Sequence, residues 1–396
     1  MPRSSRSADR PYDIALFGAS GFTGALTAEY LAAHAPEGTR WALAGRNRGK
    51  LEAVRDRLGE SGAQLAILEA DVTDAASVQR VAESAGVVVT TVGPYLQHGE
   101  PLVAACAAAG TDYVDLTGEP EFVDRMYVAH HLAAEGSGAR IVHACGFDSI
   151  PHDLGAQHTV EQLPEGLPVR LTGYVTAGGT LSGGTFASAL GAMSRLRQAG
   201  AAHRERRAAE PPASGGRVVR SVPGRPGYDR KVGKWVLPMP TIDPQIVVQS
   251  AAALERYGPE FTYSHMLAVS NPVTAAAIAG GVGGAVAAAQ LPPARALMQR
   301  LRPSGAGPSA EQIEKAWFRV RFVGEAGGRQ VVTEVRGGDP GYGETSKMLG
   351  ESALCLAHDE LPDTAGMVTT ATAMGPVLRD RLQAAGISFS VMSHGG

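Results

Sequence analysis

The stretch YDIALFGASGFTGALTAEYLAAHAPEGTRWALAGRNRGK, residues 12–50, decides the fold. An apolar run, Tyr12–Phe17, leads into the glycine-rich sequence GASGFTG, and an alanine-rich helical stretch follows at once. Gly18 allows a tight turn, Gly21 lets the backbone approach a pyrophosphate, and Gly24 lets the helix pack closely on the strand. Free N–H groups at a helix start attract phosphates. A strand, this spacing of glycines and a helix, in that order, predict a dinucleotide-binding unit.

The end of the second predicted strand indicates which dinucleotide is bound. Trp41–Ala44 is followed by Gly45 and Arg46, where an acidic residue would otherwise bind a ribose 2′-hydroxyl. Asn47 and two further basic residues, Arg48 and Lys50, come directly after. Because an arginine suits a 2′-phosphate, the sequence favours NADP(H) over NAD(H).

Composition narrows the class of protein. The 396 residues include 36 Lys and Arg against 39 Asp and Glu, a formal net charge of −3, which argues against nucleic acid as a partner. Cys106, Cys145 and Cys355 stand far apart, without a CxxC pair or histidines at metal-ligand spacing. We therefore expect no metal site, and a reducing, cytoplasmic environment.

Two segments raise the question of targeting or membrane contact. Residues 1–10 contain arginines without an apolar stretch behind them, which predicts a flexible arm rather than a signal peptide. Val273–Leu291 has no charged residue over a length that could cross a bilayer, but it is mostly alanine and glycine. We expect a close-packed buried or interface helix there, with peripheral contact to a membrane or a partner as the open alternative.

The first part of the chain alternates strand-like and helical runs, which is typical of a doubly wound parallel sheet. Six strands complete a Rossmann-type, NADP-binding domain over residues 11–163. The predicted strands are Tyr12–Phe17, Trp41–Ala44, Gln64–Glu69, Val87–Val92, Tyr113–Leu116 and Arg140–Ala144, and the predicted helices cover 23–34, 48–58, 74–84, 99–109, 120–135 and 152–162.

The second part predicts an α+β domain with an antiparallel sheet over residues 164–340. Ala316–Gly324 and Arg329–Arg336 alternate apolar and polar residues, as a hairpin with one solvated face does. Such a sheet could pair across a two-fold axis in a homodimer. Residues 341–396 are expected to form helices that pack back on the first domain. Further expected elements are strands at Val169–Thr176, Thr180–Phe186, Trp235–Leu237 and Gln245–Gln249, helices at 186–198, Tyr342–His358 and Met374–Gly386, and exposed loops at 204–230 and Pro303–Ser309.

The ligand of an open parallel sheet lies beyond the carboxyl ends of its strands. Residues that follow the third strand should lie beside the adenine, and the nicotinamide is expected between residues 93–95 and 146–149, near the DLTGE run at 115–119. The predicted cofactor-binding residues are Gly18, Ser20, Gly21, Phe22, Thr23, Gly24, Arg46, Asn47, Asp71, Val72, Val92, Gly93, Pro94, Tyr95 and Asp148.

Several of these residues have a structural alternative. Asp148 or Ser149 could cap the following helix, and an aspartate such as Asp71 could begin a turn. His98 and His152 are acid–base candidates because imidazole titrates near neutrality, although a histidine in a loop is more often a structural hydrogen-bonding group. Cys145, seven positions before His152, lacks the supporting motif of a thiol nucleophile.

With these motifs the chain resembles the saccharopine dehydrogenase-like oxidoreductases over essentially its whole length. Within them it is similar to the bacterial trans-acting enoyl reductases, which work with polyketide or lipid synthases. The widely shared motifs are GASGFTG (18–24), LAGRN (43–47), TVGPYLQHGEPLV (91–103), GTDYVDLTGE (110–119) and CGFDSIPHDLG (145–155). Those that favour the enoyl reductase branch are PTIDPQIV (240–247), GPEFTYSH (258–265) and GGDPGYGETSKMLGESALCLA (337–357).

The resemblance implies reduction of an α,β-unsaturated acyl thioester by NADPH, with the acyl chain on coenzyme A or on the acyl carrier protein of a synthase. The reaction needs a hydrogen-bond donor near the thioester oxygen and an acid near the α-carbon. Tyr95, Tyr342 and Lys347 are the candidate catalytic residues, although Lys347 could instead pair with Glu344 or Glu351.

Two other functions stay open at this point. One is a dehydrogenase acting on a C–N or C–O bond, but no obvious set of arginines is available to clamp the carboxylates of an amino-acid substrate. The other is a non-catalytic NADP-binding protein that associates with lipid or with a membrane.

Overall fold

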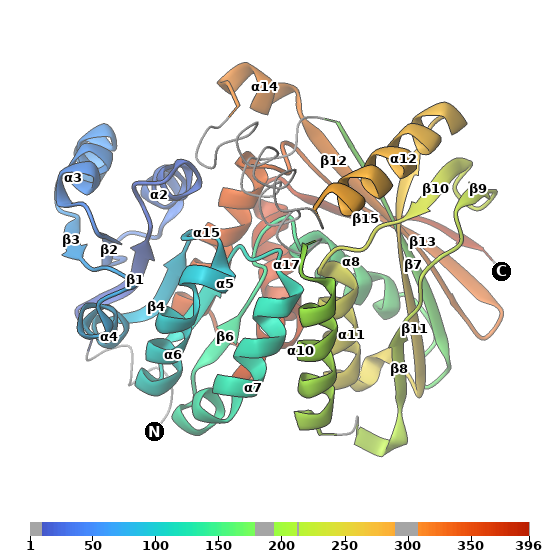
Figure 1. Ribbon diagram of the computed structural model, residues 1–396, viewed down its shortest axis with the longest axis horizontal. Coiled ribbons are helices and arrows are strands. Elements are labelled where there is room, and N and C mark those ends of the chain that lie inside the picture. The colour runs from blue at the N-terminus through green and yellow to red at the C-terminus, as the bar shows by residue number, and fades with distance from the viewer. Residues whose placement is uncertain (1–9, 179–193, 212–213, 290–307, 396) are drawn as a thin grey trace.

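The computed structural model describes residues 10–178, 194–211, 214–289 and 308–395. Two β-sheets stand side by side, with helices between them and around the first sheet (Figure 1). The predicted strand at Thr180–Phe186 and most of the predicted loop at Pro303–Ser309 lie outside the described residues, as do residues 1–9 of the predicted arm. Arg10, the last residue of that arm, is anchored by hydrogen bonds to the carbonyls of Ala82 and Ala109.

The first sheet is parallel throughout, in the order β14-β6-β5-β4-β1-β2-β3. In the central strand β1, Leu16 lies opposite Leu43 of β2 and Val89 of β4, and all three side chains are fully buried. This is the predicted doubly wound sheet. Its strands are β1 (Tyr12–Phe17), β2 (Trp41–Gly45), β3 (Ala66–Glu69), β4 (Ala85–Thr90), β5 (Asp112–Asp115), β6 (Arg140–Val142) and β14 (Gly366–Val368).

The helices that connect these strands follow the predicted positions closely. Asp74 caps α4 by accepting a hydrogen bond from the backbone N–H of Ala76, and Gly110 ends α6 in a left-handed conformation with φ 69°. One residue can therefore start or stop a helix, as expected. The helices are α2 (Phe22–His34), α3 (Arg48–Arg57), α4 (Ala75–Ser84), α5 (Tyr95–His98), α6 (Glu100–Ala109), α7 (Pro120–Ser137) and α8 (Ile150–Glu161).

The second sheet runs in the order β15-β13-β12-β7-β11-β10-β9, and β8 also pairs with β11. The predicted hairpin is confirmed as β12 and β13. Most neighbours are antiparallel, but β7 and β8 each pair parallel with β11, so the sheet is mixed. The strands are β7 (Val169–Gly178), β8 (Val218–Ser221), β9 (Gly227–Asp229), β10 (Lys234–Pro238), β11 (Glu260–Val269), β12 (Trp317–Ala326), β13 (Arg329–Gly337) and β15 (Ser388–Gly395).

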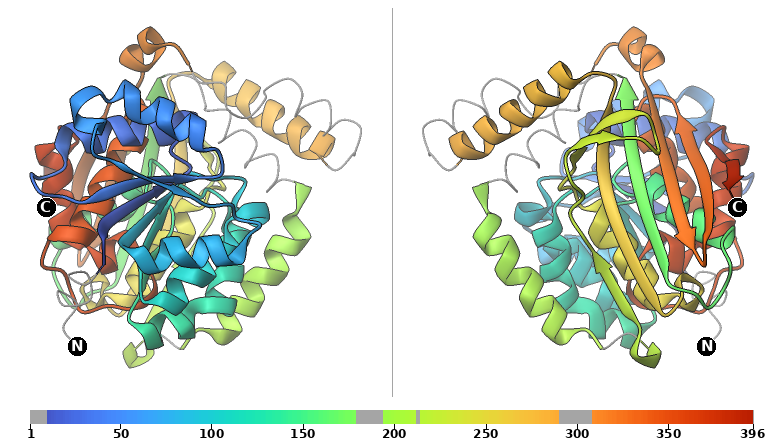
Figure 2. Two further views of the ribbon diagram at one scale, coloured as in Figure 1. Left: turned by 90° about the vertical axis from the view of Figure 1, so that its left-hand side faces the viewer. Right: turned by 90° about the vertical axis from the view of Figure 1, so that its right-hand side faces the viewer.

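Helix α8 and helix α11 (Asp243–Ala253) pack against one face of the second sheet, and the other face points away from the first sheet (Figure 2). A single cluster of buried side chains runs from Leu16 and Leu43 through Leu154 of α8 to Phe322 of β12. The two sheets therefore share one hydrophobic core. The division of the chain at residues 163 and 340 stays a prediction.

The C-terminal segment supplies helices and also completes both sheets. α15 (Gly343–His358) and α17 (Gly375–Ala384) lie where helices were predicted, and α15 packs on α2 and on the first sheet. Strand β14 adds to the first sheet beside β6, and β15 adds to the second beside β13. These two edge strands were not predicted. The short helix α16 (Thr370–Ala373) completes the segment, and another short helix, α14 (Ala310–Lys315), precedes β12.

Three other expectations are wrong in whole or in part. Gln245–Gln249 belongs to helix α11 and not to a strand, because Pro244 starts a helix whose buried Ile246 and Val247 face the core. Residues 204–209 continue helix α10 (Leu196–Ala209), and β8 and β9 interrupt the predicted loop. The alanine- and glycine-rich segment is a helix, α12 (Pro272–Ala289), that projects from the body with mostly exposed side chains (Figures 1 and 2), so it is not buried, and its contact with a partner stays a prediction.

Candidate cofactor and active site

The glycine-rich turn between β1 and α2 is shaped as dinucleotide binding requires. Gly18 has φ +89°, and a Cβ there would lie 2.6 Å from Val92. A Cβ on Gly24 would lie only 2.2 Å from the carbonyl oxygen of Gly18. At Gly21 the nearest atom would be 3.4 Å away, and no side chain caps the start of α2. The turn therefore leaves the helix N-terminus open to a pyrophosphate, and the residues present fit the dinucleotide.

The end of β2 carries the charge expected for a 2′-phosphate. Arg46 is exposed, and within the described residues its guanidinium makes no ion pair. By contrast, Arg48 pairs with Glu52, with Nε and Oε1 3.0 Å apart. Asn47 caps α3 by accepting a hydrogen bond from the N–H of Lys50 at 3.0 Å. Among the described residues, Arg46 is thus exposed and without an ion pair, whereas Arg48 is paired.

Asp71, after β3, has the turn role that the sequence left open. Its Oδ1 accepts hydrogen bonds from the backbone N–H and the hydroxyl of Thr73. These bonds hold the pKa of Asp71 below its usual range, and the charges of Arg46 and His98 lower it further. His98 is the last residue of the short helix α5, which follows β4.

A cavity of about 360 Å³ opens beside the glycine-rich turn, on the outer side of α2. Ser20 and Phe22, both predicted cofactor-binding residues, line it together with Arg57 of α3. The remaining lining residues are Gly21, Ala25, Leu26 and Glu29.

The segments that follow β4, β5 and β6 are tied to one another by buried side chains. Glu119 accepts hydrogen bonds from the backbone N–H groups of Tyr95 and Leu96, which joins the first segment to the second. Asp115 accepts hydrogen bonds from the ring of His143 at 2.7 Å and from the N–H of Ala144 at 2.9 Å, which joins the second to the third. The three loops predicted to surround the nicotinamide thus form one braced rim.

The start of α15 covers this rim and the glycine-rich turn together. The ring of Tyr342 packs edge-on against Phe22, with centroids 4.8 Å apart. Thr345 accepts a hydrogen bond from the backbone N–H of Phe147 at 3.2 Å, and the Ser346 hydroxyl lies 3.5 Å from the carbonyl of Thr23. A segment some 200 residues beyond the rim (Phe147 to Thr345 is 198) is therefore part of the same site.

Asp148 lies on this rim, directly after β6. A Cβ on Gly118, in the DLTGE run, would be 3.3 Å from its Oδ2. The residue is partly exposed, and it does not cap α8: the N-cap position belongs to Ser149, whose side chain makes no capping bond. Burial and, second, the negative charge of Asp243 raise the pKa of Asp148 to about 7.

Asp243 is fully buried between two histidines. His152 Nε2 lies 3.6 Å from Oδ1 of Asp243, and His265 Nε2 lies 3.4 Å from Oδ2. Thr241 donates a hydrogen bond to Oδ2, and Tyr263 contacts Nδ1 of His265 at 3.0 Å. Burial alone would raise the pKa of Asp243, but the histidines and Thr241 outweigh it and hold that pKa below its usual range.

The three side chains come from three elements: His152 from α8, Asp243 from the start of α11 and His265 from β11. Their ligand atoms lie within 4.8 Å of one another, and across the described ranges no other group of His, Cys, Asp or Glu meets this criterion for a metal ion. His152 also packs edge-on against Phe147, with centroids 5.3 Å apart, so the cluster sits directly under the rim. Burial lowers the pKa of His152 to about 4, which makes it neutral near pH 7.

The three candidate catalytic residues lie in different surroundings. The Tyr95 hydroxyl donates to the carbonyl of Thr90 and accepts from the N–H of Leu116, each at 3.1 Å, so it braces two strand ends. Lys347 pairs with Glu344 at 2.8 Å, which is one of the two pairings the sequence suggested. Tyr342 is beside the glycine-rich turn. Their catalytic roles stay predictions, and burial raises the pKa of the Cys145 thiol well above its usual range, which disfavours a thiolate nucleophile.

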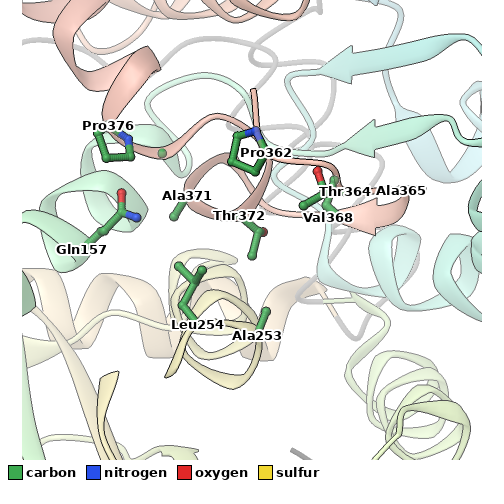
Figure 3. A pocket seen from close by; sticks show the side chains of 11 residues that line it. Gln157, Ala253, Leu254, Pro362, Thr364, Ala365, Val368, Ala371, Thr372 and Pro376 are labelled. Carbon is green, nitrogen blue, oxygen red and sulfur yellow. The ribbon is translucent and has the colours of Figure 1, made fainter. Parts of the chain in front are cut away.

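A second cavity, of about 460 Å³, lies away from the glycine-rich turn, beside the edge strand β14 (Figure 3). Its walls come from α8, α11 and the segment from Pro362 to Pro376, and they are mostly apolar. The side chains in Figure 3 are Gln157, Ala253, Leu254, Pro362, Thr364, Ala365, Val368, Ala371, Thr372 and Pro376. In the part of the chain that is described, no helix is long and apolar enough to cross a membrane.

Comparison with known proteins first defines the class. Residues 14–142 match the saccharopine dehydrogenase NADP binding domain. The fold resembles that of saccharopine dehydrogenase (L-Glu forming) from Saccharomyces cerevisiae, with a TM-score of 0.58 over 96% of this chain and 100% of that chain. At 12% identity this second likeness concerns the fold alone. The protein is an NADP-dependent oxidoreductase of the saccharopine dehydrogenase type.

Longer sequence matches place it more narrowly. A Mycobacterium tuberculosis protein provisionally named a trans-acting enoyl reductase is 42% identical, over 96% of this chain and 97% of its own. The trans-acting enoyl reductases of Mycobacterium ulcerans and Mycobacterium bovis are 35% and 36% identical, over 97% and 96% of this chain and 98% and 97% of their own. The chain belongs to the trans-acting enoyl reductase branch of the saccharopine dehydrogenase-like oxidoreductases.

Proposed function

We propose that the protein is an NADPH-dependent reductase of an α,β-unsaturated acyl thioester and acts in trans with a synthase. The observation that carries the proposal is the position of the start of α15. This branch-specific segment contacts both the glycine-rich turn, through Tyr342, and the rim, through Thr345. A substrate beside the cofactor would therefore be enclosed by residues from the beginning, middle and end of the chain.

Different residues of the chain are proposed to hold the cofactor and to act on the substrate. The glycine-rich turn holds the pyrophosphate and Arg46 the 2′-phosphate, which together favour NADPH. When bound there, NADPH supplies a hydride to the β-carbon of the thioester. Tyr342, which lies against Phe22, is proposed as the hydrogen-bond donor toward the thioester oxygen, where negative charge develops. Lys347 is the other candidate for that task, and Tyr95, whose hydroxyl donates to the carbonyl of Thr90, is the candidate on the cofactor side.

The first experiment is NADPH oxidation by the purified protein with a panel of enoyl thioesters, on coenzyme A and on an acyl carrier protein, with NADH as the control. Oxidation of NADPH that depends on the enoyl thioester, with little oxidation of NADH, is the expected result. Binding of NADPH without turnover on any thioester would contradict the proposal. Tyr342→Phe should lower turnover and leave NADPH affinity unchanged if its hydroxyl serves the substrate.

Three finer points of partnership are also proposals: delivery of the substrate on an acyl carrier protein, a homodimer, and peripheral membrane contact through α12. The first is supported by the trans-acting relatives, and the second by the open face of the second sheet. The third is supported by the exposed, uncharged surface of α12, where Val273 and Val282 are 77% and 42% exposed. Flotation with anionic liposomes, compared between the protein and its Val273→Lys, Val282→Lys variant, tests the third: equal flotation would contradict it.

A further inference from the structure

Asp148 has no evident task in holding the fold together. It does not cap α8, and within the described residues no hydrogen bond or ion pair reaches its carboxylate. It is nevertheless held in a defined place: the loop around it is fixed by bonds from Ser149 to the carbonyl of Ala144 at 2.6 Å and from Phe147 to Thr345. A carboxyl group that is well positioned, partly accessible and without a structural partner is typical of a functional group.

Its position is on the rim where the reacting end of the cofactor is expected. Asp148 follows β6, and its Oδ2 faces the backbone of Gly118 after β5, at the carboxyl edge of the sheet. The same loop touches the start of α15 through Phe147. A substrate bound between this rim and α15 would lie next to the Asp148 carboxyl.

The buried charge of Asp243 lies near it. With 0% of its side chain exposed, this carboxylate has His152, His265 and Thr241 around it. The loop and this charge are linked through one side chain: Phe147, next to Asp148, packs edge-on against His152, whose Nε2 lies 3.6 Å from Asp243. A negative charge buried this near to a second carboxyl group disfavours ionisation of that group, so the more accessible Asp148 retains its proton more readily.

We propose that Asp148 is the proton donor of the reduction and that Asp243 is the positioning residue whose buried charge tunes it for that task. The proposal rests on the proposed function, since it names the acid of that reaction. As the β-carbon receives the hydride, the α-carbon gains an electron pair. That pair takes the proton of Asp148 and forms the new C–H bond, while the O–H electrons stay on the carboxylate. Water then returns a proton to Asp148, and a saturated thioester and the oxidised dinucleotide leave.

The charges around Asp148 support this assignment. The titratable groups on the surrounding elements are Asp243, with His152 and His265 on either side of it, Glu119 on the segment after β5, and the Lys347–Glu344 pair on α15. Burial and Asp243 raise the pKa of Asp148 to about 7. The donor is therefore protonated below about pH 7, and turnover should fall as the pH rises through that value.

The first test compares pH profiles of turnover. Asp148→Asn should lower kcat by about 10²- to 10⁴-fold, the range for loss of a general acid, with NADPH affinity within about two-fold of the original. Asp243→Asn should move the basic limb of the kcat profile to lower pH by about one unit or more, because a like charge has been removed. Asp74→Asn removes the same charge at an exposed helix cap and serves as the control. An unshifted profile in Asp243→Asn would overturn the role of Asp243.

The second test does not depend on turnover. A folded-state pKa of about 7, above an unfolded value of about 4, means that Asp148 contributes its full stability below pH 4 and loses it as the pH rises to 7. Asp148→Asn should therefore raise Tm at pH 8, by at least about 2 °C, and change it little at pH 4. A Tm difference that is the same at both pH values would overturn the proposal.

The outcomes separate this inference from the proposed function. If the unaltered protein oxidises NADPH with enoyl thioesters but Asp148→Asn does so equally well, the inference fails and the function stands. If the unaltered protein reduces no thioester, the function fails. Loss of NADPH binding in Asp148→Asn, with kcat preserved at saturation, would assign Asp148 to the cofactor instead. One equivalent of divalent metal that is lost in His265→Ala would also overturn the role of Asp243, because the ion would neutralise its charge.

Discussion

The glycine-rich turn and the Asp148–Asp243 pair lie at the same edge of the molecule but are built in opposite ways. The turn is made by seven consecutive residues, and its demands are local: a positive φ at Gly18 and a close approach at Gly24. The second site combines Asp148, on the loop after β6, with Asp243 at the start of α11, and Asp243 lies 3.4 Å from His265 of β11. A local site is visible in the sequence, whereas one assembled from distant segments depends on how the two sheets meet.

The largest expected effect concerns the glycine-rich turn, which consecutive residues build. In Gly24→Val, a Cβ placed 2.2 Å from the carbonyl of Gly18 forces α2 away from β1. Unfolding free energy should fall by about 3 kcal/mol, and NADPH binding should be lost. Thermal denaturation and fluorescence titration measure both quantities. Gly280→Val is the matched control, since nothing lies within 4 Å of a Cβ there, and Gly24→Val behaving like this control would refute the packing argument.

A somewhat smaller loss of stability is expected where segments that are far apart in the sequence meet. Asp153 of α8 is buried and accepts hydrogen bonds from Ser250 at 2.5 Å, Thr370 at 2.7 Å and the N–H of Ala371 at 2.8 Å. Asp153→Ala leaves these donors without an acceptor, so it should cost about 2–3 kcal/mol of unfolding free energy in urea. Asp153→Asn keeps one acceptor oxygen and should cost less. Equal losses in the two variants would mean that the bonds are not the reason for the loss.

The cofactor preference of the turn should change when a single charge is removed. Arg46→Ala should weaken NADPH binding by about 1–3 kcal/mol, because a charge-assisted bond to the 2′-phosphate is lost, and should leave NADH unaffected. Calorimetric titration with both dinucleotides measures the difference. Arg48→Ala is the control, because Arg48 already pairs with Glu52. Equal weakening of NADPH and NADH by Arg46→Ala would contradict the assignment.

The smallest effect concerns a purely local feature away from both sites. Asp74→Ala removes the hydrogen bond to the N–H of Ala76 at the start of α4, which lies 3.1 Å away. The expected cost is about 1 kcal/mol, with NADPH affinity unchanged. Chemical denaturation of the two proteins side by side measures it. If Asp74→Ala lost as much unfolding free energy as Asp153→Ala, the exposed helix cap would stabilise the protein as much as the buried hydrogen bonds do, which would contradict this account.

Much of the first sheet could be predicted because its signals are local. Each strand is a short apolar run, and residues such as Asp74 and Gly110 mark helix ends in a way that needs no partner. The two missed edge strands, β14 and β15, have no such signal. Gly366–Val368 is three residues long and becomes a strand only because it pairs with β6.

The second half was predicted less well for the same reason. The run from Ile246 to Val248 has the composition of a strand, yet it forms part of α11, where packing against α8 and β11 outweighs that preference. The alanine and glycine content of α12 suggested close packing, but composition does not say whether a surface to pack against is present. Within the described residues, only Ala275 of that helix is buried.

The residues of the candidate site also differ in whether a local sequence signal reveals them. The glycines and Arg46 could be named from spacing alone, and Asp148 from its place after a strand. Asp243 and His265 were not singled out, although both stand in the motifs quoted as specific to the enoyl reductase branch. Each is the one acidic or imidazole side chain in its stretch, TIDPQIV and FTYSHML. A charged or imidazole side chain among apolar neighbours was the one sequence signal that could have identified them. That the two residues lie together is seen only from the packing of α11 against β11.

The most direct test of the proposed function is to follow the transferred hydrogen. The protein would be incubated with NADPH deuterated at the transferring position of the nicotinamide and with an enoyl thioester, and the product would be examined by mass spectrometry and NMR. A saturated thioester with one deuterium on the β-carbon, and a solvent-derived hydrogen on the α-carbon, is the predicted result. Recovery of the unsaturated thioester, on coenzyme A and on a carrier protein alike, would contradict it.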